Sequence, residues 1–187
     1  MTSNREKLKF ILTGFGPFEN IESNPSSELV RELGKLRSDI IATIPDIRVC
    51  ERGVDNAIES ILKLSITDDN ILVIHLGVDE GATHIKLEQF AYNEKNFRIP
   101  DMDGNVYDGE PISPGKPDRL STQLVSSSTD GHTVISSYDP GRYICNMLYY
   151  KSLDSGLQSL FIHIPPFTAI AKQEQIEIIQ RILDDIV

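Results

Sequence analysis

The sequence predicts an α/β protein, a three-layer α/β/α sandwich in which a mostly parallel, twisted central sheet lies between two layers of helices. Short apolar runs that end at glycine or proline alternate along the chain with segments whose apolar residues recur at helical spacing. One run, 70–77 (NILVIHLG), is apolar almost throughout, which is typical of a strand buried on both faces of a parallel sheet. Sites in such folds lie at the carboxyl ends of the strands. We expect a single domain spanning residues 1–187.

The individual elements follow from local patterns. Asn24 followed by Pro25 predicts a helix start, because proline fits the first helical turn and asparagine caps it. We expect the strand pattern at 40–49 to be interrupted near Pro45, and we predict a long, turn-rich excursion over 95–116. Strands are expected at 9–13, 40–49, 70–77, 85–92, 132–137 and 160–164. Helices are expected at 25–36, 54–64, 117–124, 142–153 and 171–187.

Composition argues against several classes of protein. No apolar run approaches the ~20 residues that a membrane span needs, and the polar start of the chain lacks the apolar centre of a signal peptide, so we expect a cytoplasmic protein without membrane partners. The net charge of −10, without a basic cluster, argues against a nucleic-acid partner. The two cysteines, Cys50 and Cys145, are too few for a disulfide framework. No Cys/His cluster has zinc spacing, so we expect no metal and no other cofactor.

Three residues are candidates for catalysis. Cys145 lies near the start of a predicted helix, where the helix dipole and Arg142 favour a thiolate. His163 lies near the carboxyl end of an apolar strand, a rigid position for a base, and Glu88 is an acid within an apolar stretch that needs a partner if it is buried. Each also has an ordinary explanation: a small core residue, a structural histidine like His75, and a strand residue facing water. The residues alone therefore indicate a Cys–His–Glu hydrolase without excluding these alternatives.

Four ordered motifs, which run over nearly the whole chain, resemble those of the type I pyroglutamyl peptidases (pyrrolidone-carboxylate peptidases). They are TGFGPF at 13–18 with NPS at 24–26, the block around LE at 87–88 and RIPD at 98–101, DPGRYICN at 139–146, and FIHIP at 161–165. The resemblance implies a cysteine exopeptidase that removes an N-terminal pyroglutamyl residue from peptides through a thioester. It implies that Cys145 is the nucleophile, His163 the general base and Glu88 the carboxylate that orients the histidine.

The resemblance also implies how the substrate is held. Arg98 matches a position that helps to stabilise the oxyanion, together with the backbone N–H of Cys145. Aromatic and apolar side chains form a pocket for the flat, neutral lactam ring, and a strand-end backbone hydrogen-bonds the lactam amide. The positions implied to bind the substrate are Phe15, Phe18, Val78 (through its backbone), Ile99, Tyr143 and Ile144.

This chain departs from the family pattern around the expected pocket. Val78 stands where a polar residue is expected, and Ala82 and Gln89 stand where many members have arginine, so we expect a looser or differently charged surrounding. Two alternatives stay open: a related thiol amidase acting on another capped substrate, and an inactive protein of the same fold that binds pyroglutamyl ends. The resemblance leaves both a monomer and a homo-oligomer such as a tetramer open.

Overall fold

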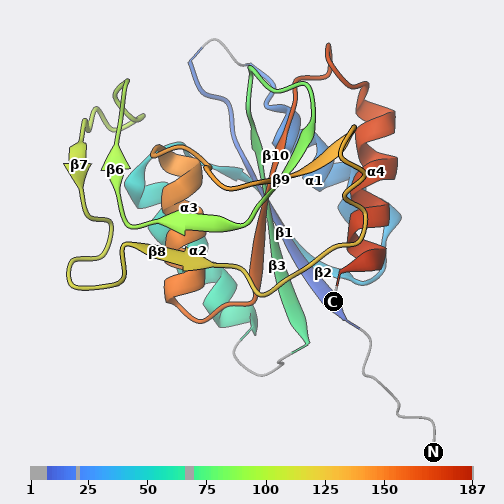
Figure 1. Cartoon of the computed structure of the whole chain (residues 1–187), viewed down its shortest axis with the longest axis horizontal. Helices are drawn as coiled ribbons and strands as arrows, with labels where there is room; N and C mark the ends of the chain where they lie inside the picture. The colour runs from blue at the N-terminus through green and yellow to red at the C-terminus, as the bar shows by residue number, and fades with distance from the viewer. Residues whose placement is uncertain (1–7, 20–21, 66–69, 187) are drawn as a thin grey trace, which may run out of the picture.

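A six-stranded sheet in the order β2-β1-β3-β10-β4-β9 forms the centre of the molecule (Figure 1). The computed structural model describes residues 8–19, 22–65 and 70–186. Strands β2, β1, β3 and β10 are parallel to one another, whereas β4 runs antiparallel to β10 and β9 runs parallel to β4. The strands are β1 Lys9–Phe15, β2 Ile40–Ile47, β3 Ile71–Val78, β4 Ile85–Glu88, β9 Val134–Ser137 and β10 Ser159–Ile164.

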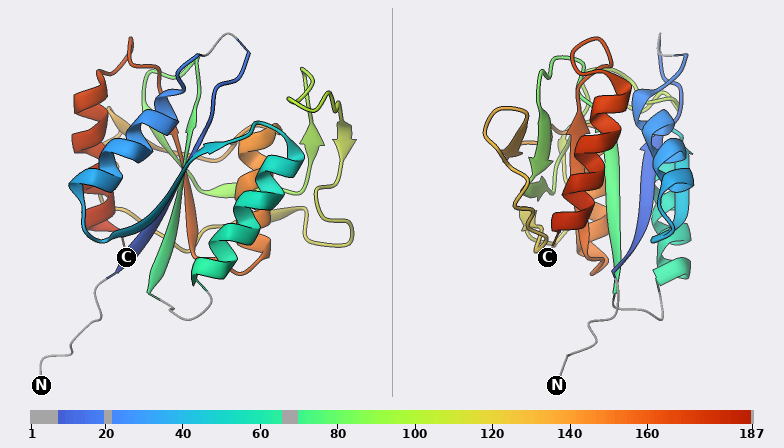
Figure 2. Two further views of the ribbon diagram at one scale, coloured as in Figure 1. Left: turned by 180° about the vertical axis from the view of Figure 1, so that it is seen from behind. Right: turned by 90° about the vertical axis from the view of Figure 1, so that its right-hand side faces the viewer.

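Helices cover both faces of this sheet. Helices α1 and α4 pack together on one face and α2 and α3 on the other, as Figures 1 and 2 show. The helices are α1 Pro25–Leu36, α2 Glu51–Ser65, α3 Ile144–Asp154 and α4 Lys172–Asp185. The predicted three-layer sandwich with a mostly parallel sheet is therefore confirmed. Within the part of the chain that the structure describes, every helix falls short of the length and apolarity needed to cross a bilayer.

The central strand β3 is buried from Ile71 to Gly77, as its apolar sequence predicted. His75 lies in the middle of this strand, and its Nδ1 is 2.8 Å from the hydroxyl of Thr13 on β1. Complete burial lowers the pKa of His75 to about 3, so the ring is neutral. His75 is thus a structural histidine, in agreement with its interpretation from the sequence.

Strand β2 was expected to break at Pro45, but it continues through this residue. It lies at the edge of the sheet, where a proline, which has no N–H, is tolerated because one side of the strand has no neighbouring strand to bond within the described part of the chain. The pairing of β1 with β2 shifts register near this residue, between Thr13↔Ile44 and Phe15↔Ile47.

The segment 117–124 was expected to be a helix, and this is wrong. It contains a short strand, β8 Arg119–Ser121, which pairs antiparallel with β5 Phe90–Tyr92. The pairing also explains why the expected strand 85–92 is divided at Gln89: β4 belongs to the central sheet, whereas β5 leaves it to join β8. Within the excursion, β6 Lys95–Asn96 and β7 Asp108–Glu110 form a small hairpin beside α3 (Figure 1).

Candidate active site

Cys145 is the second residue of helix α3 and is half-buried. The helix is preceded by Tyr143, whose side chain makes no capping hydrogen bond. The first intrahelical bond runs from the N–H of Met147 to the carbonyl of Tyr143. The backbone N–H groups of the first turn, including that of Cys145, therefore have no intrahelical acceptor. They make this helix end a site that favours negative charge.

Gly77 near the end of β3 allows the thiol to lie against the sheet. A Cβ on Gly77 would be 3.0 Å from Sγ of Cys145 and 2.7 Å from Cζ of Phe161, which is closer than such atoms normally approach. This glycine therefore has a role in the site that the sequence analysis missed. Its signal was a glycine at the end of the most apolar run, which indicated only where the strand ends.

His163 lies on β10 between β3 and β4, with Gly77 and Lys86 as its register partners. Its Nδ1 is 2.8 Å from Oε1 of Glu88, the last residue of β4. Glu88 is fully buried, which excludes the alternative that it faces water. Its backbone carbonyl accepts a hydrogen bond of 2.8 Å from the Tyr149 hydroxyl on α3, so the helix that carries Cys145 also holds Glu88.

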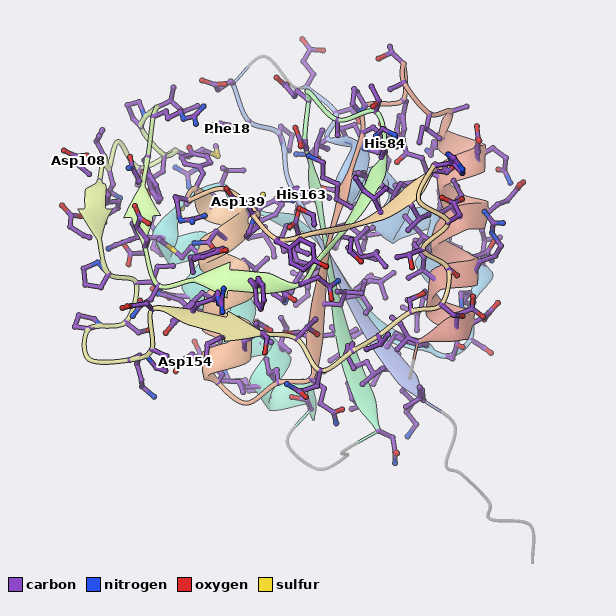
Figure 3. The ribbon with its side chains drawn as sticks, viewed as in Figure 1. Phe18, His84, Asp108, Asp139, Asp154 and His163 are labelled. Atoms are coloured by element: carbon purple, nitrogen blue, oxygen red, sulfur yellow. The ribbon has the colours of Figure 1, made fainter. Side chains whose placement is uncertain are left out.

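The charge of His163 depends on two opposing effects. Burial disfavours the imidazolium, but interactions with the side chains of Cys145 and Glu88 outweigh it and raise the pKa of His163 to about 9. The ring is therefore protonated at neutral pH, next to the thiol. In the view of Figure 3, His163, Phe18 and Asp139 all lie in the upper half of the molecule, toward the carboxyl ends of the parallel strands.

The opening motif and the NPS motif form one structural unit. The N–H of Phe15 donates to Oγ of Ser26 at 3.0 Å, and the side-chain amide of Asn24 donates to the carbonyl of Gly16 at 3.1 Å. Gly14 is needed here because a Cβ would come within 2.8 Å of the Ser26 backbone. The start of α1 thus holds the turn that carries the two phenylalanines of the motif.

Aromatic rings connect this turn with the candidate catalytic residues. The rings of Phe18 and Tyr143, both half-buried, have centroids 6.0 Å apart. Phe15 is buried, and its ring contacts that of Phe161 at 6.5 Å. Phe161 in turn contacts the ring of His163 at 4.7 Å. Both phenylalanines of the motif therefore lie near residues of the candidate site.

Arg98 and Ile99 lie on an exposed segment that is attached to the start of α3. The Tyr143 hydroxyl donates to the carbonyl of Pro100 at 3.2 Å, and the ring of Phe97 packs edge-on against Tyr143 at 4.7 Å. This attachment brings the segment next to the residues that precede Cys145. Arg98 itself is exposed, so the structure leaves its guanidinium accessible to solvent.

The remaining expected binding residues have different surroundings. Val78 is the half-buried last residue of β3 and pairs with Ile164. Ile144 is only 1% exposed and packs within the core between the sheet, α2 and α3. Of the departures from the family pattern, Ala82 is buried, and the Gln89 side-chain amide donates to a neighbouring backbone carbonyl.

Cys50, the second cysteine, has different surroundings. It is buried at the residue before α2, and its sulfur accepts the N–H of Gly53 at 3.4 Å. Both cysteines are free. Among the described residues, no group of three or more His, Cys, Asp or Glu side chains is arranged to hold a metal ion.

A thiol at a helix N-terminus, beside an imidazole that is hydrogen-bonded to a buried carboxylate, is the arrangement used by cysteine hydrolases. Comparison with known proteins narrows this class. Residues 8–180 match the family model of the pyroglutamyl peptidases. The chain belongs to the pyroglutamyl peptidase family.

Individual relatives agree with the family model. The chain is 29% identical over 172 residues to a pyrrolidone-carboxylate peptidase of Coprothermobacter proteolyticus, covering 84% of this chain and 81% of the relative. It is 32% identical over 171 residues to one of Vibrio vulnificus, covering 84% of this chain and 78% of the relative. The crystal structure of pyroglutamyl peptidase I from Bacillus amyloliquefaciens superimposes with a TM-score of 0.83 and 26% identity, covering 96% of each chain.

Proposed function

We propose that Cys145, His163 and Glu88 carry out the reaction of this pyroglutamyl peptidase, the removal of an N-terminal pyroglutamyl residue from a peptide. The observation that carries the proposal is the 2.8 Å hydrogen bond between His163 and the buried Glu88, on a histidine that also interacts with Cys145. A carboxylate at Nδ1 fixes the orientation of the ring and leaves Nε2 for proton transfer.

In the first half-reaction, the Cys145 thiolate attacks the carbonyl carbon of the pyroglutamyl residue, and the carbonyl oxygen becomes an oxyanion. The free N–H of Cys145 at the start of α3 and the guanidinium of Arg98 donate hydrogen bonds to this oxygen. The His163 imidazolium then gives its proton to the amide nitrogen as the C–N bond breaks. The shortened peptide leaves with a free amino group, and the pyroglutamyl group remains as a thioester.

In the second half-reaction, neutral His163 takes a proton from a water molecule, whose oxygen attacks the thioester carbonyl. The C–S bond breaks, pyroglutamate leaves, and the thiolate–imidazolium pair is restored. The pKa of about 9 for His163 suits both halves, because the ring starts protonated at neutral pH and is regenerated in that form.

Recognition of the lactam ring is assigned to the aromatic residues near the start of α3. Phe18 and Tyr143 present half-buried rings, and Phe15 and Ile144 support them from the core. Ile99 closes the exposed side, and the Val78 backbone pairs with the lactam amide. An apolar lining of this kind favours a neutral ring over the charged ammonium of an uncyclised glutamine.

The proposal includes a cytoplasmic location and peptide substrates. Two free cysteines, one of them half-buried, are compatible with a reducing compartment. Size-exclusion chromatography with light scattering distinguishes the monomer from a homo-oligomer such as a tetramer.

The test is hydrolysis of a fluorogenic pyroglutamyl amide, with the corresponding prolyl amide as control. We expect the pyroglutamyl amide alone to be cleaved, and Cys145→Ser to lose nearly all turnover while keeping the wild-type melting temperature. Iodoacetamide should label Cys145 before Cys50 and abolish turnover. Activity that survives in Cys145→Ser, or that disappears on labelling of Cys50, contradicts the assignment. Binding without turnover in the wild type would favour an inactive pyroglutamyl-binding protein.

A further inference from the structure

An ion pair lies beside the candidate base. Oδ2 of Asp79 is 2.7 Å from Nζ of Lys86, and the two side chains are 34% and 29% exposed. Asp79 follows the last residue of β3, and Lys86 is the second residue of β4. The strand between β3 and β4 is β10, which carries His163. The ion pair therefore spans the strand on which the histidine lies.

Strand geometry places the ion pair on the same face of the sheet as His163. Gly77 faces the Cys145 thiol, and side chains alternate along a strand, so Asp79 extends on that face too. The pairing with β10 continues to this point, because the N–H of Asp79 donates to the carbonyl of Ile164 at 3.0 Å. Lys86 is the register partner of His163 and lies two residues before Glu88.

Lys86 thus lies opposite His163 on β4, two residues before Glu88, whose carboxylate is hydrogen-bonded to the ring. A lone ammonium next to the imidazolium would disfavour its charge. Asp79 cancels that effect, and its carboxylate is held in place because Oδ1 also accepts the N–H of Gly81 at 3.1 Å.

The charge state of Asp79 agrees with this geometry. Burial opposes its ionisation, but the hydrogen bond with Lys86 and the nearby charge of His163 hold the pKa of Asp79 below its usual value. The effect of His163 is the smallest of these causes, and it agrees with the position of Asp79 on the face of the sheet that carries His163. The ionisable groups that face His163 from the surrounding elements are Asp79 at the end of β3, Lys86 and Glu88 on β4, and Cys145 on α3. The Tyr149 hydroxyl on α3 is bonded to the backbone carbonyl of Glu88.

We propose that Asp79 and Lys86 are positioning residues that cover the outer side of His163 with a neutral ion pair and set the pH range in which the Cys145–His163 pair is active. The inference rests on the proposed function, because it gives His163 the role of general acid and base. Asp79 lies between Val78 and Ala82, two positions at which this chain departs from the family pattern.

The test breaks the ion pair from each side and measures kcat/KM of the pyroglutamyl amide against pH. Asp79→Asn leaves Lys86 uncompensated, so the alkaline limb should move to lower pH by about 0.5–1 unit. Lys86→Met leaves Asp79 uncompensated, so the limb should move to higher pH by a similar amount. The double variant should return to the wild-type profile. Glu59→Gln breaks the exposed 2.6 Å ion pair with Lys63 on α2 and is the matched control, with no shift expected.

The inference would be overturned if the alkaline limbs of the two single variants move in the same direction, or if neither moves. An ion pair with a merely structural role would not move the two limbs in opposite directions. NMR titration of His163 in the Cys145→Ser background separates this result from the proposed catalysis. Opposite shifts of the His163 titration in the two variants support the ion-pair role even if the catalytic assignment fails. If the His163 titration is unshifted in both variants while the Cys145, His163 and Glu88 assignments hold, the ion-pair role is refuted and the proposed function is not.

Discussion

Replacement of Glu88 by glutamine isolates the charge of the carboxylate that we propose orients His163. The side chain keeps its shape at a position that is fully buried and 2.8 Å from Nδ1 of His163. Glutamine can accept the same hydrogen bond through its oxygen, or it can present its amide N–H and force the ring into the other tautomer. Either way, the imidazolium loses the negative charge beside it.

The size of the effect follows from these contacts. A neutral partner that permits the wrong tautomer costs up to about 10⁴-fold in kcat, by comparison with the equivalent change in a serine protease. Stability should change far less. Oε2 of Glu88 is buried without a hydrogen-bond partner among the described residues, so the cost of a new unpaired amide group, about 1–3 kcal/mol, is offset by removal of a buried charge.

The pH dependence gives a second measure with a definite sign. The pKa of His163 is raised to about 9, so wild-type kcat/KM should fall as the pH rises through this value. Glu88→Gln removes one of the interactions that raise the pKa, so the alkaline limb should move to lower pH. The control is Gln89→Ala at the neighbouring position. The Gln89 side chain donates to the backbone carbonyl of Leu87, so its loss should be mild. A Glu88→Gln enzyme with wild-type kcat and profile would refute the reasoning and leave a Cys–His dyad.

Three further substitutions test how the site is built. Gly77→Ala adds a Cβ 3.0 Å from Sγ of Cys145. It should lower kcat by on the order of 10²-fold and the free energy of unfolding by about 1–3 kcal/mol, as measured by activity kinetics and denaturant titration. Wild-type kinetics in this variant would contradict the close approach of the thiol to Gly77. Asn24→Ala removes the cap of α1 and the hydrogen bond to the carbonyl of Gly16. It should lower the free energy of unfolding by about 1–2 kcal/mol, as measured by thermal melting, and it should raise KM. An unchanged KM would show that this turn does not shape the substrate pocket. Phe18→Ala should raise KM more than it lowers kcat. The wild type should cleave a pyroglutamyl peptide far better than the same peptide with an uncyclised N-terminal glutamine. Equal kcat/KM for the two peptides would argue against an apolar pocket for the lactam ring.

Several features of the fold were predictable because they depend on residues close together in the chain. The start of α1 at Pro25, capped by Asn24, follows from steric and hydrogen-bonding properties of two adjacent residues. The burial of β3 follows from its uninterrupted apolar run. The mistaken helix at 117–124 shows the limit of such local patterns. Its residues form a strand because β5 lies opposite them, and a strand needs a partner that the local sequence does not specify.

The sequence by itself determined the α/β class, the family and the three candidate catalytic residues, since ordered motifs are visible without coordinates. Only the tertiary structure showed where the three candidates lie relative to one another. Glu88 is an acid on a short strand in the sequence, and its carboxylate reaches Nδ1 of His163 because β4 lies next to β10. Gly77 leaves room for the thiol because α3 brings Cys145 against it from 68 positions along the chain. Charge, burial and close approach at this site are properties of residues distant in sequence, so they arise only when the chain has folded.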